Sequence, residues 1–146
     1  MSSTKNIFVD TNVLLDVLTN REPYYLASAQ IWNLCEQGTL KGHISVISFN
    51  NIYYIARKLH DKKTAQQMMA LLQGVFHPVA LDAQVISQAV GSNMSGGSDF
   101  EDAIQFHSAV RAKANFLITR NISHFPKSAI PVITPKEFLA TWSSKN

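Results

Sequence analysis

The sequence predicts an α/β fold: a three-layer α/β/α sandwich in which helices cover both faces of a central, mostly parallel sheet. Two observations predict it. Short apolar segments of strand length alternate along the chain with longer segments whose apolar residues recur every three or four positions. Strands that alternate with helices lie parallel, because each connection crosses back over the sheet. The 146 residues contain no linker, repeat or low-complexity tract, so we expect one domain that spans residues 1–146.

The first part of the chain is predicted to fold as a strand and two helices. Residues 6–9 are an apolar run of strand length, and residues 13–18 continue as a short helix. Residues 24–36 follow with apolar side chains at helical spacing. Pro23 stands where a first helical turn tolerates proline, and Gly38 is typical of a helix C-terminus.

The middle of the chain repeats this alternation. Residues 41–45 are predicted to form a short strand, and residues 47–59 a helix whose apolar residues recur at three and four positions. Asp61 is placed to cap a further helix at residues 64–72. A strand at residues 76–81 follows this helix.

The last part of the chain begins with a helix at residues 85–90, for which Asp82 is the cap. A loop at residues 91–98 contains three glycines and is either a mobile lip over a neighbouring site or plain surface. The remaining elements are, in order, a helix capped by Ser98 or Asp99 that runs to about residue 113, strands at 116–118 and 131–133, and a helix at 135–142.

Composition limits the classes of function. The chain is 46% hydrophobic and 16% charged, which is typical of a compact domain, and its net charge of +3 is compatible with a phosphate-backbone partner. Cys35 is the single cysteine and lies in an apolar stretch, so we expect a buried thiol and neither a disulfide nor a cysteine-based zinc site. The sequence has no signal-type segment and no apolar run of membrane-spanning length, so we expect a cytoplasmic protein without a membrane partner. Glycine-rich phosphate loops and nucleophile elbows are absent, which disfavours dinucleotide binding and serine-hydrolase chemistry.

The first predicted strand ends at Asp10, the most informative single residue of the chain. In open parallel sheets ligands bind beyond the carboxyl ends of the strands, and a buried carboxylate is costly unless a metal or a hydrogen-bond donor compensates it. Asp10 either lies in such a site or caps the following helix, although Thr11 and Asn12 are available as caps. Asp16 either turns toward the same strand end or faces solvent.

A second acidic feature lies far along the chain, where Asp99, Glu101 and Asp102 account for three of the ten carboxylates. Asp99 and Asp102 are three positions apart on a helix and project from nearly the same face, whereas we expect Glu101 to be solvated or paired with a lysine. The aspartates either stabilise the helix N-terminus or hold a cation. Brought next to Asp10 by the fold, they would make an oxygen-lined site for Mg²⁺ or Mn²⁺.

Uncharged polar residues mark the same region of the predicted sheet. Thr119 and Asn121 follow the strand at residues 116–118. Asn121 could ligate a cation or hold a metal-bound water, and Thr119 could position an aspartate. Asn50 and Asn51 interrupt an otherwise apolar helix, where asparagine is unfavourable, so we expect one of them to face a polar cavity.

An aromatic and basic stripe lies on the same helix as these asparagines. It consists of Tyr53, Tyr54, Arg57 and Lys58, with Lys62 and Lys63 beyond them. Such a stripe either binds single-stranded nucleic acid by stacking and phosphate contacts, or consists of tyrosines that pack in the fold and basic side chains that are solvated. The five histidines show no metal-ligand spacing.

Three segments together resemble the motifs of the PIN-domain family, and in particular its toxin branch, the VapC-like ribonucleases. They are Phe8–Asn12 with Leu14–Asp16, Asp99–Ala103, and Ile118–Asn121 with Phe125. Residues 130–139 are also similar to the terminal strand and helix of that family. The resemblance implies a compact α/β/α fold, carboxylates at one edge that bind Mg²⁺ or Mn²⁺, and cleavage of RNA. It also implies the toxin of a toxin–antitoxin pair, with an antitoxin protein as partner and a homodimer as the assembly.

The resemblance assigns roles to residues of this chain. Asp10 matches the first metal ligand of the family and Asp102 the acid that opens the later helix, with Asp99 as an auxiliary ligand. Asn51 stands where the family usually has glutamate, and Asn121 where aspartate is common. In the roles that the resemblance implies, Asn51 would orient waters or ligands and Asn121 would contact a water in the site.

The departures from the family pattern remove negative charge from the site, and His124 likewise stands where an acid is frequent. We therefore expect one metal ion rather than two. Thr11 would help to orient waters or ligands, and Arg120 with the stretch 57–63 would contact phosphates. The alternative is a catalytically weakened PIN-like module that binds RNA or a partner protein without cleavage.

Overall fold

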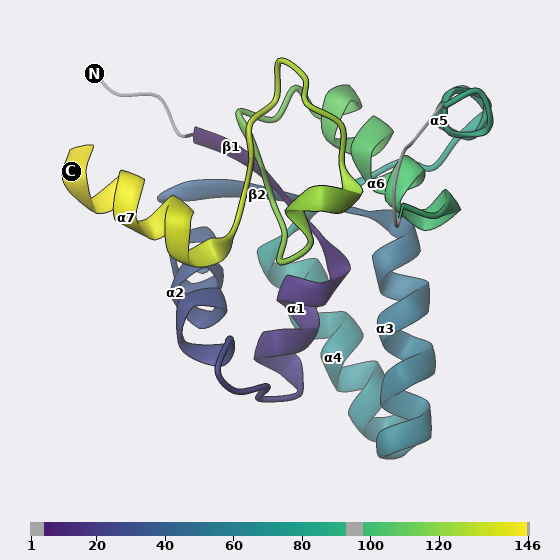
Figure 1. Ribbon diagram of the computed structural model, residues 1–146. Helices are drawn as coiled ribbons and strands as arrows, with labels where there is room; N and C mark the ends of the chain where they lie inside the picture. The colour runs from purple at the N-terminus through teal and green to yellow at the C-terminus, as the bar shows by residue number, and fades with distance from the viewer. Residues whose placement is uncertain (1–4, 93–97, 146) are drawn as a thin grey trace.

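The computed structural model describes residues 5–92 and 98–145 and contains the predicted α/β/α sandwich (Figure 1). Within these residues, five strands form one sheet in the order β3-β2-β1-β4-β5, and every neighbouring pair is parallel. The strands are β1 (Lys5–Val9), β2 (Leu40–Ser45), β3 (His77–Val79), β4 (Phe116–Ile118) and β5 (Val132–Ile133). Because β1 is central, its carboxyl end lies between those of β2 and β4.

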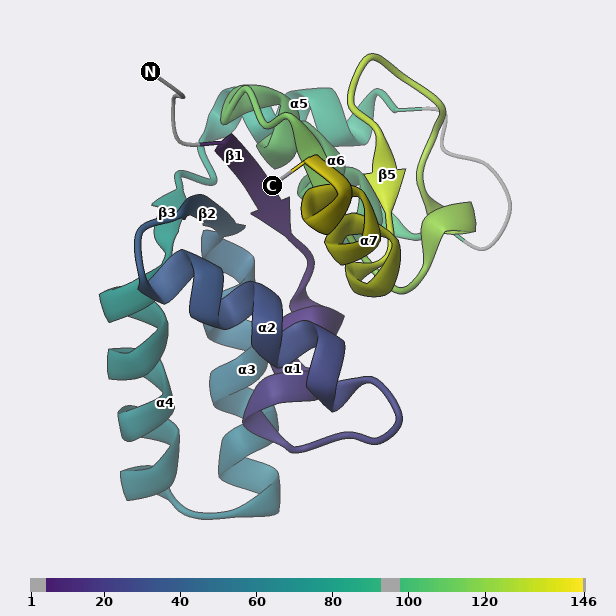
Figure 2. The same cartoon turned by 90° about the vertical axis from the view of Figure 1, so that its left-hand side faces the viewer.

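The helices connect these strands on both sides of the sheet. They are α1 (Thr11–Leu18), α2 (Tyr25–Glu36), α3 (Val46–Leu59), α4 (Lys62–Val75), α5 (Ala83–Val90), α6 (Phe100–Arg111), the short 3-10 helix η1 (Ile122–His124) and α7 (Pro135–Lys145). Figure 1 shows α2 and α7 on one side of the sheet and α5 and α6 on the other. Helices α3 and α4 lie side by side and extend away from the carboxyl ends of the strands (Figure 2).

Two hydrophobic cores explain why helices cover both faces, because alternate residues of β1 point to opposite sides. Ile7 and Val9 belong to the larger core, together with side chains of α1, α2 and α7. Phe8 points to the other side and packs with Ala109 of α6. Cys35 lies in the larger core, which confirms the predicted buried thiol.

Capping residues determine where several helices begin. Asp61 and Asp82 cap α4 and α5 as predicted, with side chains that accept hydrogen bonds from backbone N–H groups of the first turn. At α1 the cap is Asp10, one of the two alternatives for that residue; Thr11 and Asn12, the other candidates, lie within the helix. The backbone of Asp10 continues the extended conformation of β1, so the carboxylate that ends the strand also starts the helix.

Two further predictions concern the loop before α6 and membrane-spanning segments. The loop expected as a lip over the site falls largely on residues 93–97, which lie outside the described residues. In the part of the chain that the structure describes, no helix is long and apolar enough to cross a membrane.

Candidate active site

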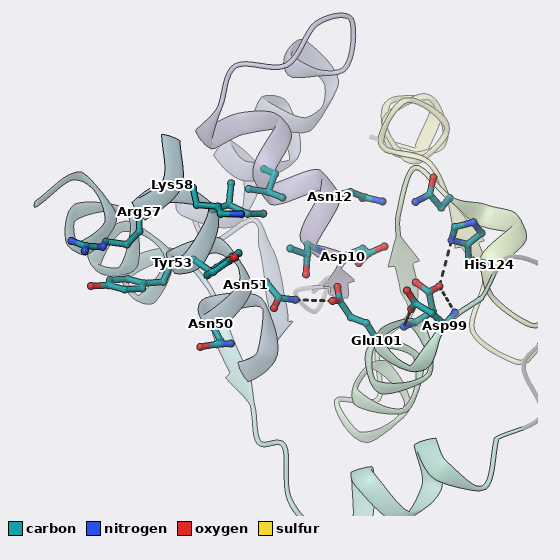
Figure 3. Close-up of a pocket in the computed structure, with 16 residues that line it drawn as sticks. Asp10, Asn12, Asn50, Asn51, Tyr53, Arg57, Lys58, Asp99, Glu101 and His124 are labelled. Atoms are coloured by element: carbon teal, nitrogen blue, oxygen red, sulfur yellow. Dashed lines mark hydrogen bonds and ion pairs between the residues drawn. The ribbon is translucent and has the colours of Figure 1, made fainter. Parts of the chain in front are cut away.

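A pocket of about 1060 Å³ opens at the carboxyl ends of β1 and β4, between α1, α3 and the start of α6 (Figure 3). Four of its lining residues are acidic: Asp10, Asp99, Glu101 and Asp102. They come from two segments that are far apart in the sequence. The parallel pairing of β1 with β4, the strand after α6, places these segments together. The predicted meeting of the two acidic features is confirmed.

Asp10 is held in place by two hydrogen bonds and is only 5% exposed. Its Oδ1 accepts from the backbone N–H of Thr11 and its Oδ2 from the hydroxyl of Thr119, both at 2.7 Å. Burial raises the pKa of Asp10 to about 6; the hydrogen bonds from Thr119 and Thr11 oppose the rise, and the negative charges of Asp102 and Glu101 add to it. Thr119 therefore positions an aspartate, as predicted.

Asp99 and Asp102 form a capping box at the start of α6. The side chain of each accepts a 3.0 Å hydrogen bond from the backbone N–H of the other. Asp102 also lies 3.4 Å from Nδ1 of His124. Burial raises the pKa of Asp102, although the backbone N–H of Asp99 and the nearby His124 favour its anion. The two aspartates thus cap the helix and line the pocket at the same time.

Glu101 also lines the pocket, so the expectation that it would be solvated or paired with a lysine was wrong. Its Oε1 accepts a 2.8 Å hydrogen bond from the side-chain amide of Asn51 on α3. Burial raises the pKa of Glu101; the amide of Asn51 lowers it, and the negative charges of Asp99 and Asp102 raise it. The spacing along the helix placed Glu101 on a different face of α6 from Asp99 and Asp102. The first turn of α6 borders the pocket, however, and the long side chain of Glu101 reaches into it (Figure 3).

One side of α3 forms the opposite wall of the pocket. Its lining residues there are Asn50, Asn51, Tyr53, Tyr54, Ile55, Arg57 and Lys58. Both asparagines line the pocket, although only one was expected to do so. Nζ of Lys58 lies 4.9 Å from the centre of the Tyr54 ring, so the aromatic and basic side chains interleave as the sequence suggested.

Comparison with known proteins places the chain in a family. A model of the PIN domain matches residues 6–123, which is most of the sequence. The chain belongs to the PIN-domain family. Ribonuclease VapC1 of Aquifex aeolicus is similar to this PIN domain, with 24% identity over 145 residues that cover 97% of this chain and 99% of the relative.

Solved structures share the fold of this PIN domain. A chain of a toxin–antitoxin complex from Klebsiella pneumoniae superposes with a TM-score of 0.65 at 23% identity, over 88% of this chain and 97% of the other. VapC20 of Mycobacterium tuberculosis, a toxin described as cleaving the sarcin-ricin loop, gives a TM-score of 0.62 at 15% identity, over 76% and 86% of the two chains. The fold class and the family inferred from the sequence motifs are therefore confirmed.

In this PIN domain the partly buried Arg120 pairs with a buried carboxylate. Nε of Arg120 lies 2.8 Å from Oδ2 of Asp16, which is fully buried, and its guanidinium lies 4.0 Å from the centre of the Tyr24 ring. Arg120 is not among the described residues that line the pocket, and its phosphate contact stays a prediction. Asp16 points inward, and its buried carboxylate would be strongly destabilising without the Arg120 partner.

Asn12 and Asn121 line the pocket beside Thr119. Asn12 connects α1 to the segment after β4, because its Nδ2 donates to the hydroxyl of Thr119 and its Oδ1 accepts from the backbone N–H of Arg120, both at 3.4 Å. The backbone N–H of Asn121 donates to the same hydroxyl at 3.0 Å. These contacts hold Asn12 and the backbone of Asn121 against Thr119, whereas the predicted role of Asn121 toward a metal stays a prediction.

Behind the pocket, three buried polar side chains connect the helices that carry it. The hydroxyls of Thr11 on α1 and Ser48 on α3 lie 2.7 Å apart, and the amide of Gln105 on α6 donates to Thr11 at 2.7 Å and to Ser48 at 3.4 Å. Thr11 itself lines the pocket, and Ser48 and Gln105 each lie within one helical turn of a residue that lines it. Thr11 therefore supports the pocket through this network, of which the sequence analysis missed Ser48 and Gln105.

The polar groups of the pocket fit a hard divalent cation. The pocket combines four carboxylates with the side-chain amides of Asn51 and Asn121, and such oxygens are the ligands that Mg²⁺ and Mn²⁺ prefer. Repulsion among the carboxylates contributes to the raised pKa values of Asp10, Glu101 and Asp102, and a cation would relieve it. Among the described residues, no three carboxylate, imidazole or thiol groups make a ready-formed metal site, so water or substrate oxygens would complete the shell.

Proposed function

We propose that this PIN domain is a Mg²⁺- or Mn²⁺-dependent endoribonuclease and the toxin of a toxin–antitoxin pair. The observation that carries the proposal is the pocket, in which four carboxylates lie opposite a wall of tyrosine and basic side chains. A cation and a phosphate backbone would be accommodated side by side there. Ribonuclease VapC1 and the toxin–antitoxin complex of the same fold support the assignment.

Asp10, Asp102 and Asp99 would hold the cation. When bound, a divalent cation stabilises negative charge on a phosphate and lowers the pKa of an attacking water. Two hydrogen bonds orient Asp10, and the capping box orients Asp102, so both carboxylates are aligned in advance of binding. We expect one ion per chain, because Asn51 and Asn121 bring oxygen atoms to the pocket without charge.

Single-stranded RNA is the substrate that the wall of α3 favours. Tyr53 and Tyr54 offer rings on which bases can stack, and Arg57 and Lys58 offer positive charge for phosphates. Each neutralised phosphate releases counterions, so we expect RNA binding to weaken steeply as the salt concentration rises. A cytoplasmic location belongs to the same proposal, because the RNA substrate is found there.

The proposed protein partner is an antitoxin, and the proposed assembly is a homodimer. The first proposal is supported by the shared fold with a chain of a toxin–antitoxin complex. Coexpression with the product of an adjacent small gene, followed by purification through one tagged chain, tests the antitoxin. Light scattering of the purified chain tests the dimer, and a monomer at all concentrations would contradict it.

The test of the proposed activity is Asp102→Asn. Removing a ligand should reduce metal-dependent RNA cleavage by more than about 100-fold, the upper range for losing a group that only supports a ligand. Cleavage of a single-stranded RNA is measured with Mn²⁺ and with EDTA. The control is Glu36→Gln, which removes an exposed carboxylate at the end of α2, outside the pocket. Unchanged cleavage by a folded Asp102→Asn variant would overturn the assignment.

A further inference from the structure

The pocket obtains its negative charge from two of its three sides. The described lining residues on α3 include asparagines, tyrosines and the basic residues Arg57 and Lys58, but no carboxylate. The acidic groups come from the end of β1, at Asp10, and from the start of α6. A cation bound against Asp10 would therefore have its remaining acidic ligands on α6 alone.

Glu101 is the α6 carboxylate that reaches across toward α3. Its Oε1 accepts the 2.8 Å hydrogen bond from the amide of Asn51, and its side chain is partly buried. Figure 3 shows the carboxylate of Glu101 in the middle of the pocket, between Asn51 and the segment that carries Asp10. A carboxylate has about four lone-pair sites, and this hydrogen bond uses one of them, so Glu101 can also bind a cation.

Glu101 has no ion-pair partner in the part of the chain that the structure describes, although Arg57 and Lys58 line another part of the pocket. Among the described residues, no lysine or arginine forms an ion pair with Glu101 or with Asp10. Asp99 and Asp102 lie on the same helical turn, and the N-terminus of α6 offers only a fraction of a positive charge to all three acids. A divalent cation would supply the missing charge.

We propose that Glu101 is a ligand of the divalent cation, directly or through a bound water, and that Asn51 is a positioning residue that holds the Glu101 carboxylate toward Asp10. The acidic ligand that α3 lacks is thus provided from α6, with its orientation set by an amide on α3. This inference rests on the proposed metal-dependent function. It also removes the reason to regard the pocket as weakened by Asn51.

Isosteric variants test this proposal by Mn²⁺ titration calorimetry, without RNA. Glu101→Gln removes the charge and keeps the shape, and we expect the Mn²⁺ affinity to fall by more than about 10-fold. The double variant N51D/E101Q exchanges charge and amide across the same hydrogen bond. It should recover most of the lost affinity, because it restores a carboxylate at the same place in the pocket.

Controls separate this inference from the proposed function. Glu36→Gln should bind Mn²⁺ as the unmodified chain does, and melting in EDTA shows whether each variant is folded. Mn²⁺ binding by the unmodified chain that persists unchanged in a folded Glu101→Gln variant would overturn the role of Glu101 alone. A double variant that binds no better than Glu101→Gln would overturn the positioning by Asn51. Absence of Mn²⁺ binding in the unmodified chain would instead overturn the proposed metal site as a whole.

Discussion

Replacing Asp10 by asparagine should make the metal-free protein more stable at neutral pH. The carboxylate of Asp10 is buried, and its nearest charged neighbours in the pocket are themselves acidic. Its ionisation is therefore unfavourable in the folded chain unless a cation is bound. Asparagine has the same shape without the charge, and its amide can rearrange the two hydrogen bonds that hold residue 10.

The magnitude follows from the pKa. Burial and neighbouring charges raise the pKa of Asp10 from 3.8 to about 6, and at about 1.4 kcal/mol per pH unit this corresponds to a cost of about 3 kcal/mol. Between these two pH values the folded chain holds a proton that the unfolded chain releases, so stability is lost as pH rises through this window. Asp10→Asn has no carboxylate to ionise at position 10, so its stability does not fall in this way.

The assay is urea denaturation of both proteins in EDTA at several pH values from 4 to 8. The stability of Asp10→Asn relative to the unmodified chain should rise by up to about 3 kcal/mol across the window. Lost hydrogen bonding lowers the stability of the variant by about 1 kcal/mol at every pH and therefore does not change this rise. Mn²⁺ in hundredfold excess over its Kd should then stabilise the unmodified chain by about 2.7 kcal/mol and leave the variant unchanged.

Two results would refute this reasoning. One is a stability difference between the proteins that does not change from pH 4 to pH 8, because the titration of Asp10 would then make no contribution. The other is equal stabilisation of both proteins by Mn²⁺, because Asp10 would then not be a ligand.

Two further pairs of substitutions, each with its own control, test ion pairing and packing. Arg120→Met leaves Asp16 buried without its partner and should cost about 3–5 kcal/mol in urea denaturation, whereas Arg111→Met breaks an exposed pair and should change little; equal losses would contradict the argument. Gly42→Ala would place a methyl group 2.7 Å from a buried sulfur and 2.8 Å from a phenylalanine ring, and should destabilise by about 1–3 kcal/mol. Gly74→Ala meets nothing within 4 Å in the last turn of α4, so it should stabilise by up to about 0.5–1 kcal/mol, the value for the middle of a helix; the opposite order of melting temperatures would refute this comparison.

Most of the fold could be predicted because its signals are local. The apolar run that becomes β1 and the aspartates that cap α4 and α5 act through residues next to them in the chain. Boundaries were less certain where local signals compete. The strand predicted at 76–81 is only His77–Val79, and α6 ends at Arg111 rather than near Lys113, which has a left-handed backbone with φ of 56°.

The site could be predicted only in part, because much of it depends on pairs of residues from different helices. Asp10 and Asp102 were identifiable, since strand ends and helix starts have recognisable positions in a sequence. The pocket position of Glu101 depends on the amide of Asn51, which is 50 positions away. The use of Arg120 depends in the same way on buried Asp16, 104 positions away. Neither partner can be recognised before the helices are placed.

The order of the segments has a consequence for protein synthesis. Asp10 and the hydroxyl of Thr119 that orients it are 109 positions apart. A ribosome therefore makes β1, β2 and the helices around them well before it makes β4 and the residues that follow. Until then the growing chain has Asp10 without the Thr119 hydroxyl and without the second acidic segment. We therefore expect the proposed nuclease activity to be absent while the messenger that encodes the chain is still being read through this region.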